Sequence, residues 1–565
     1  MNRKLLAGLA CIALASCKSA PPQDQWKDFA QQTVERYFAL NPNFAVYQGD
    51  HSYDGKLPDW SEAGLKQQAD FLHRTIDKAR EFNDLSKADA FERDYLVQTA
   101  EGQLFFLENA DFPHRNPAYY TSSLDPSVYI SRDYADKPTR LKAMIAFFNQ
   151  VPQAAKDIRA NLKAPLPASF VKYGIAAFDG YADYYSKDAV DAFADVGVPE
   201  LQSRYKLASR NAAQAMRGLA DWLRSQQGSA TQDFALGPDK FSQMLKATEG
   251  VDIPLDQLMQ VGRADLARNQ AAAKAECAKF APGMTVPQCF QKMTDDKPAG
   301  GPVAAATRML PDLTAFVKAQ DLVTIPGTEQ ALVRESPPYN RQNIAYIDPP
   351  GPLEHGIPSI YYISPPDPAW SAKVQRDYLP GKASLVFFTA HEVMPGHFVQ
   401  FLHSNRAPSL IGRLFVGYGF AEGWAHYAEQ LVWDAGYGNG DPEIHLGQIG
   451  EALERDCRFI SAIGLHTQGM TVTQSKQLFI DQCYKDEGSA EQQAARGTYD
   501  PEYLNYTLNK LLILKLRDDW TATRGGRKAW KRFHDAFLSY GGPPVPLVRM
   551  AMMGEDAPRT VFRSD

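Results

Sequence analysis

The chain has 565 residues, of which 44% are hydrophobic and 22% are charged, a composition typical of a folded globular protein and not of a disordered one. Its 60 lysines and arginines stand against 66 aspartates and glutamates, which leaves a formal charge of −6. A net negative charge offers no attraction to a phosphate backbone, so these totals argue against nucleic acid as a partner.

The first residues have the features of an export signal. Arg3 and Lys4 form a basic start, and the apolar run that follows is too short to cross a membrane. The run ends in Leu14-Ala15-Ser16-Cys17, which resembles the lipobox of bacterial lipoproteins. We therefore expect residues 1–16 to be a signal peptide and Cys17 to receive a lipid; a plain secretory signal is the alternative.

The same segment predicts the location of the protein. Residues 17–25 are expected to form a tether to the lipid. Lys18 follows the cysteine where an aspartate would favour the inner membrane, so resemblance to known sorting rules favours the outer membrane, on its periplasmic side. No later stretch has the run of about eighteen apolar residues that a spanning helix needs, so we expect membrane contact through lipid alone.

Four cysteines follow the export segment, and an oxidising compartment favours disulfides between them. Three pairings are possible, and local pairs are the simplest. We therefore predict bonds between Cys277 and Cys289 and between Cys457 and Cys483, with buried free thiols as the alternative.

The chain from 26 to 230 is predicted to be an N-terminal helical region. Trp26, Phe29, Val34, Tyr37 and Phe38 recur close to the 3.6-residue period of a helix. An aromatic, proline-rich interruption at 112–138 reads as a long loop. Residues 231–565 are expected to form a catalytic region that is continuous with the first, with a break at 297–302.

Between 336 and 381 the chain is rich in proline and glycine, which excludes regular helix there. Within it, residues 359–364 form a candidate strand of aromatic and β-branched residues, which could pair with an extended peptide. Helices return from Ser384 and run to about Tyr540. The predicted fold is therefore predominantly α, with a small β element next to a helix that binds a metal.

The candidate metal helix carries His391-Glu392-Val393-Met394-Pro395-Gly396-His397. Zinc hydrolases need imidazole or carboxylate ligands around one ion and a carboxylate that takes a proton from the attacking water. On a regular helix the two histidines would lie about 9 Å apart along the axis, which is too far for one ion. Pro395 and Gly396 can deform the helix and bring His397 back toward His391, and such local irregularity is typical of functional sites.

The third ligand is expected downstream, where Glu422, His426 and Glu429 share one face of an apolar helix. Glu422 is the preferred ligand, with His426 expected beside the ligands without binding the metal; the alternative is His426 as the ligand and Glu422 outside the ligand set. Glu429 is predicted to orient a ligand histidine through a hydrogen bond, with a solvent-facing glutamate as the alternative.

Residues 391–400 and Glu-Gly-Trp-Ala-His-Tyr at 422–427 resemble the family called domain of unknown function 885. The family is regarded as zincin-like and mainly helical, similar to thimet oligopeptidase and angiotensin-converting enzyme. The resemblance implies that His391, His397 and Glu422 are the metal ligands and that Glu392 is the general base. The chain departs from the family at Asn509, where relatives usually show glycine.

Tyr506 matches a tyrosine of a family motif, and the resemblance makes it a candidate donor to the oxyanion. A tyrosine amid leucines is equally explained by packing. Arg455 and Arg458 lie three residues apart on one helical face, where they could grip a substrate carboxylate or form solvated surface charge.

These features together predict zinc-dependent hydrolysis of peptide bonds in the bacterial periplasm, with a peptide as the substrate. Zinc suits mixed imidazole and carboxylate ligation, although manganese or cobalt could substitute. The alternatives are a metal-dependent amidase acting on cell-wall peptides or acylated amino acids, and a lipid-tethered binding protein without activity. The intact Glu392 argues against the binding protein, because a scaffold has no use for a base beside the metal.

Overall fold

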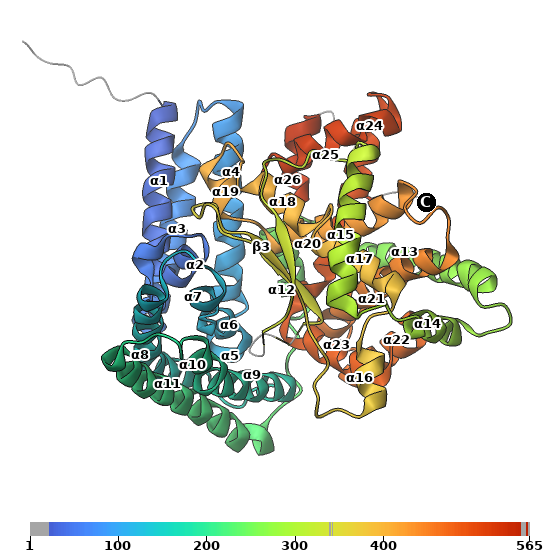
Figure 1. Ribbon diagram of the computed structural model, residues 1–565. Coiled ribbons are helices and arrows are strands. Elements are labelled where there is room, and N and C mark those ends of the chain that lie inside the picture. Colours follow the sequence, from blue (N-terminus) through green and yellow to red (C-terminus); the bar gives the residue numbers. More distant parts are fainter. Residues whose placement is uncertain (1–21, 338–340, 342, 555–560, 563–565) are drawn as a thin grey trace, which may run out of the picture.

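A computed structural model describes residues 22–337, 341, 343–554 and 561–562 of the chain. Helices make up most of this part, and one small sheet lies near its middle (Figure 1). The predicted class, a predominantly α fold with a small β element, is confirmed. Cys17 and the rest of the export segment lie outside the described residues.

The N-terminal region is helical, as its periodicity predicts. Trp26, Val34 and Phe38 are buried on one side of the first helix. In Figure 1 helices α1, α3 and α4 stand side by side on one flank, with α8, α9 and α11 below them. The helices of this region are α1 (Pro22–Leu40), α2 (Pro42–Tyr47), α3 (Glu62–Glu81), α4 (Lys87–Leu104), α5 (Phe112–Arg115), α6 (Ala118–Thr121), α7 (Val128–Ser131), α8 (Lys137–Asn161), α9 (Ala168–Ser186), α10 (Asp188–Ala192) and α11 (Pro199–Gln226).

The expectation of a long loop at 112–138 is wrong, because α5, α6 and α7 lie within it. Proline is tolerated in the first turn of a helix, where its missing N–H is not needed, and Pro113 occupies such a position in α5. The Tyr120 hydroxyl donates to the Pro113 carbonyl at 2.6 Å and ties α6 to α5. Single helical turns thus fit between the prolines.

The rest of the chain is also helical, with the predicted break falling between α14 and α15. Before the sheet come α12 (Pro238–Glu249), α13 (Leu255–Phe280), α14 (Val286–Asp295) and α15 (Pro302–Ala319). After it come α17 (Lys382–Glu392), α18 (His397–Ser404), α19 (Leu410–Leu414), α20 (Tyr418–Asp434), α21 (Pro442–Thr467), α22 (Val472–Cys483), α23 (Glu487–Tyr499), α24 (Asn505–Ala522), α25 (Trp530–Leu538) and α26 (Val545–Met553).

The sheet has three strands in the order β1-β3-β2, formed by β1 (Ala331–Glu335), β2 (Ala345–Asp348) and β3 (Ser359–Ile363). The predicted strand at 359–364 is confirmed as β3, whereas β1 and β2 were not predicted. Because β3 pairs with β1 on one edge and β2 on the other, its backbone has no free edge for a peptide. The suggestion that this strand pairs with substrate is therefore wrong.

Regular helix is present in the proline-rich segment, contrary to the sequence-based expectation. Helix α16 (Ala372–Tyr378) lies between Pro368 and Pro380, where the chain has no proline. The Ser371 side chain caps it by accepting from the Val374 N–H at 3.3 Å. A capped stretch of this length is enough for about two turns.

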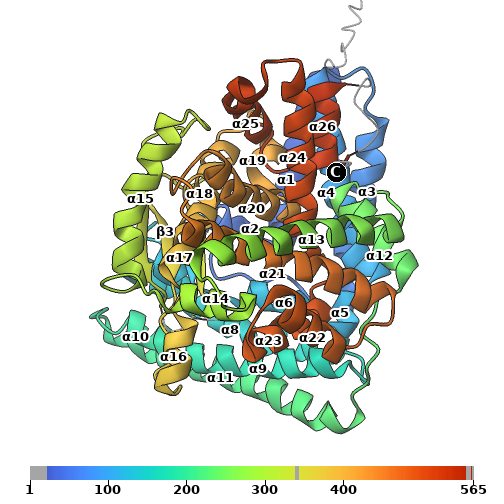
Figure 2. The ribbon, with the colours of Figure 1, turned by 90° about the vertical axis from the view of Figure 1, so that its right-hand side faces the viewer.

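Helix α21 forms the centre of the C-terminal core, because it packs against α13, α17 and α22 and is buried along most of its length. Helix α20 packs against α24 and α17, and Figure 2 shows α18 beside it. These contacts bring the two predicted metal-binding segments, on α17 and α20, against each other.

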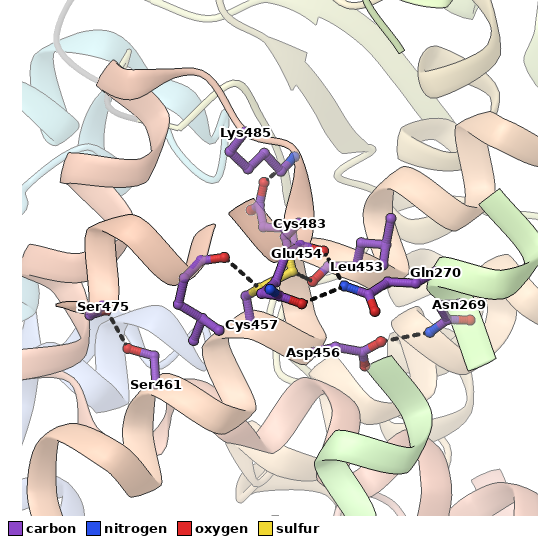
Figure 3. The surroundings of a disulfide bond; sticks show 12 residues. Asn269, Gln270, Leu453, Glu454, Asp456, Cys457, Ser461, Ser475, Cys483 and Lys485 are labelled. Atoms are coloured by element: carbon purple, nitrogen blue, oxygen red, sulfur yellow. Dashed lines mark hydrogen bonds and ion pairs between the residues drawn. A yellow bond between two sulfur atoms is a disulfide. The ribbon is translucent and has the colours of Figure 1, made fainter. Parts of the chain in front are cut away.

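Both predicted disulfides are present, Cys277–Cys289 and Cys457–Cys483. The second joins α21 to the end of α22, beside the Glu454–Lys485 ion pair (Figure 3). Each bond links segments that are already neighbours in sequence, as the local pairing supposed. Among the described helices, none is both long enough and apolar enough to cross a membrane.

Candidate metal centre

The motif at 391–397 interrupts the helix completely. Helix α17 ends at Glu392, and α18 begins at His397. The Gly396 N–H donates to the Ala390 carbonyl at 2.9 Å, and a Cβ on Gly396 would lie only 1.8 Å from the His391 carbonyl oxygen. Only glycine fits this close approach. The predicted deformation is thus a tight turn between two helices, and it returns His397 toward His391.

The turn places the two imidazoles against each other. The rings of His391 and His397 are perpendicular, with their centroids 4.8 Å apart. From α20, Glu422 places Oε2 at 3.3 Å from His391 Nε2 and at 3.5 Å from His397 Nε2. The three residues predicted as metal ligands therefore converge, with one candidate ligand atom from each within 4.8 Å of the others.

The chemistry of this cluster fits zinc. Glu422 Oε2 and His397 Nδ1 are buried and have no hydrogen-bond partner among the described residues. Two imidazoles and one carboxylate, with a fourth position open to water, is a ligand set used by catalytic zinc sites. His426, the alternative third ligand, lies outside the cluster that the described residues form.

Opposite charges within the cluster shift the pKa values of its side chains. Burial would lower the pKa of His391, but the neighbouring carboxylates of Glu422 and Glu429 raise it to about 10. Burial would raise the pKa of Glu422, but His397 and His391 hold it well below its ordinary value. Glu422 therefore carries its negative charge, as a metal ligand must.

Glu429 is fully buried and accepts two hydrogen bonds from imidazoles. His391 Nδ1 lies 2.6 Å from its Oε1, and His426 Nδ1 lies 3.2 Å from its Oε2. An ionised carboxylate can only accept, so Nδ1 of His391 keeps its proton, and Nε2 is the nitrogen that becomes free for a metal when the imidazole loses its second proton. The alternative of a solvent-facing Glu429 is wrong. Glu429 thus joins His426 to His391.

Glu392, the candidate base, is the last residue of α17 and is buried. Burial raises the pKa of its carboxyl, and the neighbouring His391 and His397 oppose this shift. A raised pKa brings a carboxyl closer to neutral pH, where it exchanges protons most effectively. The site thus contains a carboxylate suited to proton transfer beside the ligand cluster.

Tyr506, from α24, lies next to the cluster. Its ring is nearly parallel to that of His391, with the centroids 6.4 Å apart, and its residue is 7% exposed. The guanidinium groups of Arg455 and Arg458 lie over its ring at 5.7 and 5.0 Å from the centroid. Tyr506 is therefore placed beside the candidate ligands. Its neighbours include an imidazole and two guanidinium groups as well as the leucines expected from the sequence.

Of the two roles considered for Arg455 and Arg458, solvated surface charge is wrong. Neither side chain is solvated, and each is already paired with carboxylates of its own helix. Arg455 forms an ion pair with Glu451 and lies 3.4 Å from Glu429, and Arg458 donates to Glu454 at 2.6 Å. These internal partners leave the two arginines as parts of the buried framework behind Tyr506.

Two residues that the sequence did not single out as site residues lie beside Tyr506. Tyr418 is one helical turn before Glu422 on α20, a spacing that could have revealed it. Arg496, from α23, donates to the Tyr418 hydroxyl at 2.9 Å. Arg496 lies in Arg496-Gly497-Thr498, a stretch that resembles the family, but only helix packing brings it to Tyr418.

Asn509, the expected departure from the family pattern, is fully buried. Its side chain donates to the buried Glu249 at 3.0 Å. A Cβ on Gly423 would lie 2.2 Å from the Asn509 Cβ, so a glycine on α20 makes room for the larger residue. The departure from the family pattern is accommodated inside the α20–α24 contact.

Comparisons with known proteins agree with the fold. A structure of a candidate lipoprotein of unknown function from Shewanella oneidensis aligns at a TM-score of 0.77 and 24% identity, covering 94% of this chain and 99% of that one. A candidate lipoprotein from Colwellia psychrerythraea aligns at 0.77 and 17% identity, with the same coverage of 94% and 99%. An M32 carboxypeptidase from Deinococcus radiodurans R1 aligns at only 0.37 and 13% identity, over 87% of this chain and 94% of that one, which is too low to establish a shared fold.

No protein of curated function matches the sequence. The profile of a family described as bacterial protein of unknown function, DUF885, matches residues 42–552. This range contains both halves of the metal cluster and all the helices that position it. The chain therefore belongs to the DUF885 family, as the motifs at 391–400 and 422–427 predicted.

Proposed function

We propose that the protein is a zinc-dependent peptidase. The observation that carries this proposal is the convergence of His391, His397 and Glu422 with Glu392 directly after the first of them. Glu392 is a buried carboxylate next to this cluster but is not one of its ligands, so it is available to activate water. A binding scaffold would gain nothing from it.

The residues divide the chemistry between them. Zinc held by the three ligand side chains would lower the pKa of a water molecule and polarise the carbonyl of the scissile bond. Glu392 takes the proton of the attacking water and later delivers it to the leaving amine. Its burial, which raises its pKa, suits both transfers.

The surrounding residues position these groups. Glu429 fixes the ring of His391 through the 2.6 Å hydrogen bond, so that Nε2 faces the cluster. Tyr506 donates from its hydroxyl to the oxyanion that forms when water attacks the carbonyl. Its place beside His391 supports this role.

The proposed location is the periplasmic face of the cell envelope, with the outer membrane favoured. The lipobox-like sequence ending at Cys17 supports a lipid anchor there. Two proteins of similar fold are described as candidate lipoproteins, which is consistent with such an anchor. Peptides that reach the periplasm are the proposed substrates.

The decisive test is Glu392→Gln in purified protein loaded with zinc. We expect zinc binding to persist and peptide hydrolysis to fall by about 10²- to 10⁴-fold, because only the proton transfer is removed. Zinc content by mass spectrometry and cleavage of a peptide library would be measured together. Glu443→Gln is the matched control, since Glu443 lies in the first turn of α21, about 18 Å along that helix from Arg455.

The outcomes separate the candidate functions. A wild-type protein that holds zinc and cleaves no member of the library would contradict the peptidase. Hydrolysis confined to acylated amino acids or cell-wall peptides would favour an amidase. Peptide affinity without turnover, unchanged by Glu392→Gln, would favour a binding protein.

A further inference from the structure

Two tyrosines connect the candidate metal centre to an arginine outside it. Tyr506 lies parallel to the ring of His391, and the ring of Tyr418 stands perpendicular to Tyr506 at 5.8 Å between centroids. The Tyr418 hydroxyl accepts from Arg496 Nη2 at 2.9 Å. A continuous path of contacts thus leads from a candidate ligand to the guanidinium of Arg496.

The three arginines around Tyr506 differ in how they are used. The side chains of Arg455 and Arg458 are 8% and 9% exposed, and acidic side chains of the protein pair with both. The side chain of Arg496 is 28% exposed. Arg496 is therefore the member of this group that a solute can reach.

The hydrogen bonds of Arg496 leave donors free. Its Nε donates to Asp500 at 2.9 Å, and its Nη2 donates to Tyr418. Among the described residues these bonds use two of the five N–H groups of a guanidinium. Asp500 binds from the Nε side and holds the group in place, and the remaining donors on the two terminal nitrogens can bind another carboxylate in a forked geometry.

The position of Arg496 sets the kind of carboxylate that it can bind. Tyr418 and Glu422 are separated by one turn of α20, which is about 6 Å along the helix axis. An extended peptide advances about 3.5 Å per residue. The guanidinium of Arg496 lies at the end of the Tyr418 side chain, so a carboxylate bound to it would lie a few residues of extended chain beyond the bond at the metal centre.

We propose that Arg496, oriented by Tyr418 and Asp500, binds the free C-terminal carboxylate of the peptide substrate. This inference rests on the proposed peptidase function and refines it: the enzyme removes a short fragment of a few residues from the C-terminal end. Arg496 is the specificity-determining residue for that end, and it takes no part in the bond cleavage.

The test compares one peptide as a free acid and as its C-terminal amide. We expect the wild type to prefer the acid by about 10- to 100-fold in kcat/KM, which is the worth of a charge-assisted hydrogen bond. Arg496→Gln should lower kcat/KM for the acid to the level of the amide, mainly through KM, and leave the amide unchanged. Arg496→Lys should restore part of the preference, since it keeps the charge.

Binding provides a readout that does not depend on turnover. In the Glu392→Gln protein, calorimetry should show tighter binding of the acid than of the amide, by about the same 10- to 100-fold. Adding Arg496→Gln should abolish that difference. The products of the wild type, measured by mass spectrometry, should be short fragments of a few residues from the C-terminal end.

Several results would overturn the inference and leave the peptidase standing. These are equal cleavage of acid and amide by the wild type, an equal loss on both substrates in Arg496→Gln, and cleavage at internal bonds. If neither peptide is hydrolysed, the proposed function fails, and the binding comparison alone then decides the role of Arg496.

Discussion

Removing the charge of Glu429 tests the organisation of the metal centre most directly. Burial would raise the pKa of this carboxyl, but Arg455 and His426, with the hydrogen bond from His391, lower it well below its ordinary value. It therefore accepts from both imidazoles as a carboxylate. In Glu429→Gln the amide has one oxygen, so one imidazole loses its acceptor and faces an NH2 group.

The size of the effect follows from these contacts. The His391 hydrogen bond is the shorter one, at 2.6 Å against 3.2 Å for His426. Losing the acceptor of a metal-binding histidine typically lowers metal affinity by about 10- to 100-fold, which corresponds to about 1.4–2.8 kcal/mol. We expect a weakening of zinc binding in this range.

The assay is a zinc titration against a chelator of known affinity. Glu451→Gln is the matched control, because Glu451 is also a buried partner of Arg455, and among the described residues no hydrogen bond or ion pair joins it to His391. It should cost stability and keep zinc affinity within about twofold of the wild type, because the His391 hydrogen bond stays intact. Unchanged zinc affinity in Glu429→Gln, or an equal loss in both variants, would refute the proposed role of Glu429.

Three further predictions concern stability. Replacing Cys457 and Cys483 by alanine opens a loop with a sequence separation of 26 and should cost about 3.5 kcal/mol of unfolding free energy in urea titrations. Lys510→Met should cost about 2–3 kcal/mol by the same measurement, since it removes the 2.9 Å partner of the buried Asp265 and leaves that carboxylate with Arg268 as its cationic partner. Hydrogen bonds to Asp54 and Glu354 raise the pKa of the His51 imidazole to about 9 from an ordinary 6.5, against the opposing effect of burial, so stability from this group is full below pH 6.5 and is lost as the pH rises through 9. His51→Gln should flatten that decline in urea midpoints measured across this pH range.

The first two predictions have a control variant, and the third has an outcome that would contradict it. Opening the Cys277–Cys289 loop, with a separation of 12, should cost less, about 2.8 kcal/mol, and a reversed order would contradict the loop argument. Lys66→Met removes an exposed pair with Asp70 and should cost under about 1 kcal/mol; an equal cost for Lys510→Met would show that burial does not matter. A His51→Gln protein with an unchanged pH profile would exclude His51 as the titrating group.

Local patterns predicted much of this molecule. The 3.6-residue recurrence of Trp26, Phe29 and Val34 gave the helical class, since burial of one helix face requires that period. The local disulfides were predictable because short loops keep the partners close. The clash between a Pro-Gly pair and the helix around it marked the candidate metal segment before any contact was known.

The same local reasoning failed where single turns or edge strands were involved. Hydrophobic periodicity does not predict short helices such as α7 and α16, because one or two turns contain too few residues to show a repeat. Strands β1 and β2 exist through their pairing with β3, and the sequence of an edge strand carries only a weak signal.

Sequence alone determined which side chains could bind a metal and where the helix had to break, because both follow from chemistry within a few residues of chain. Only the tertiary structure decided that Glu422 reaches both imidazoles, that Glu429 is buried behind them and that Arg496 lies at the far side of Tyr418. These contacts join helices far apart in the chain. The packing of α17, α20, α23 and α24 sets such distances, and no spacing within a single segment encodes them.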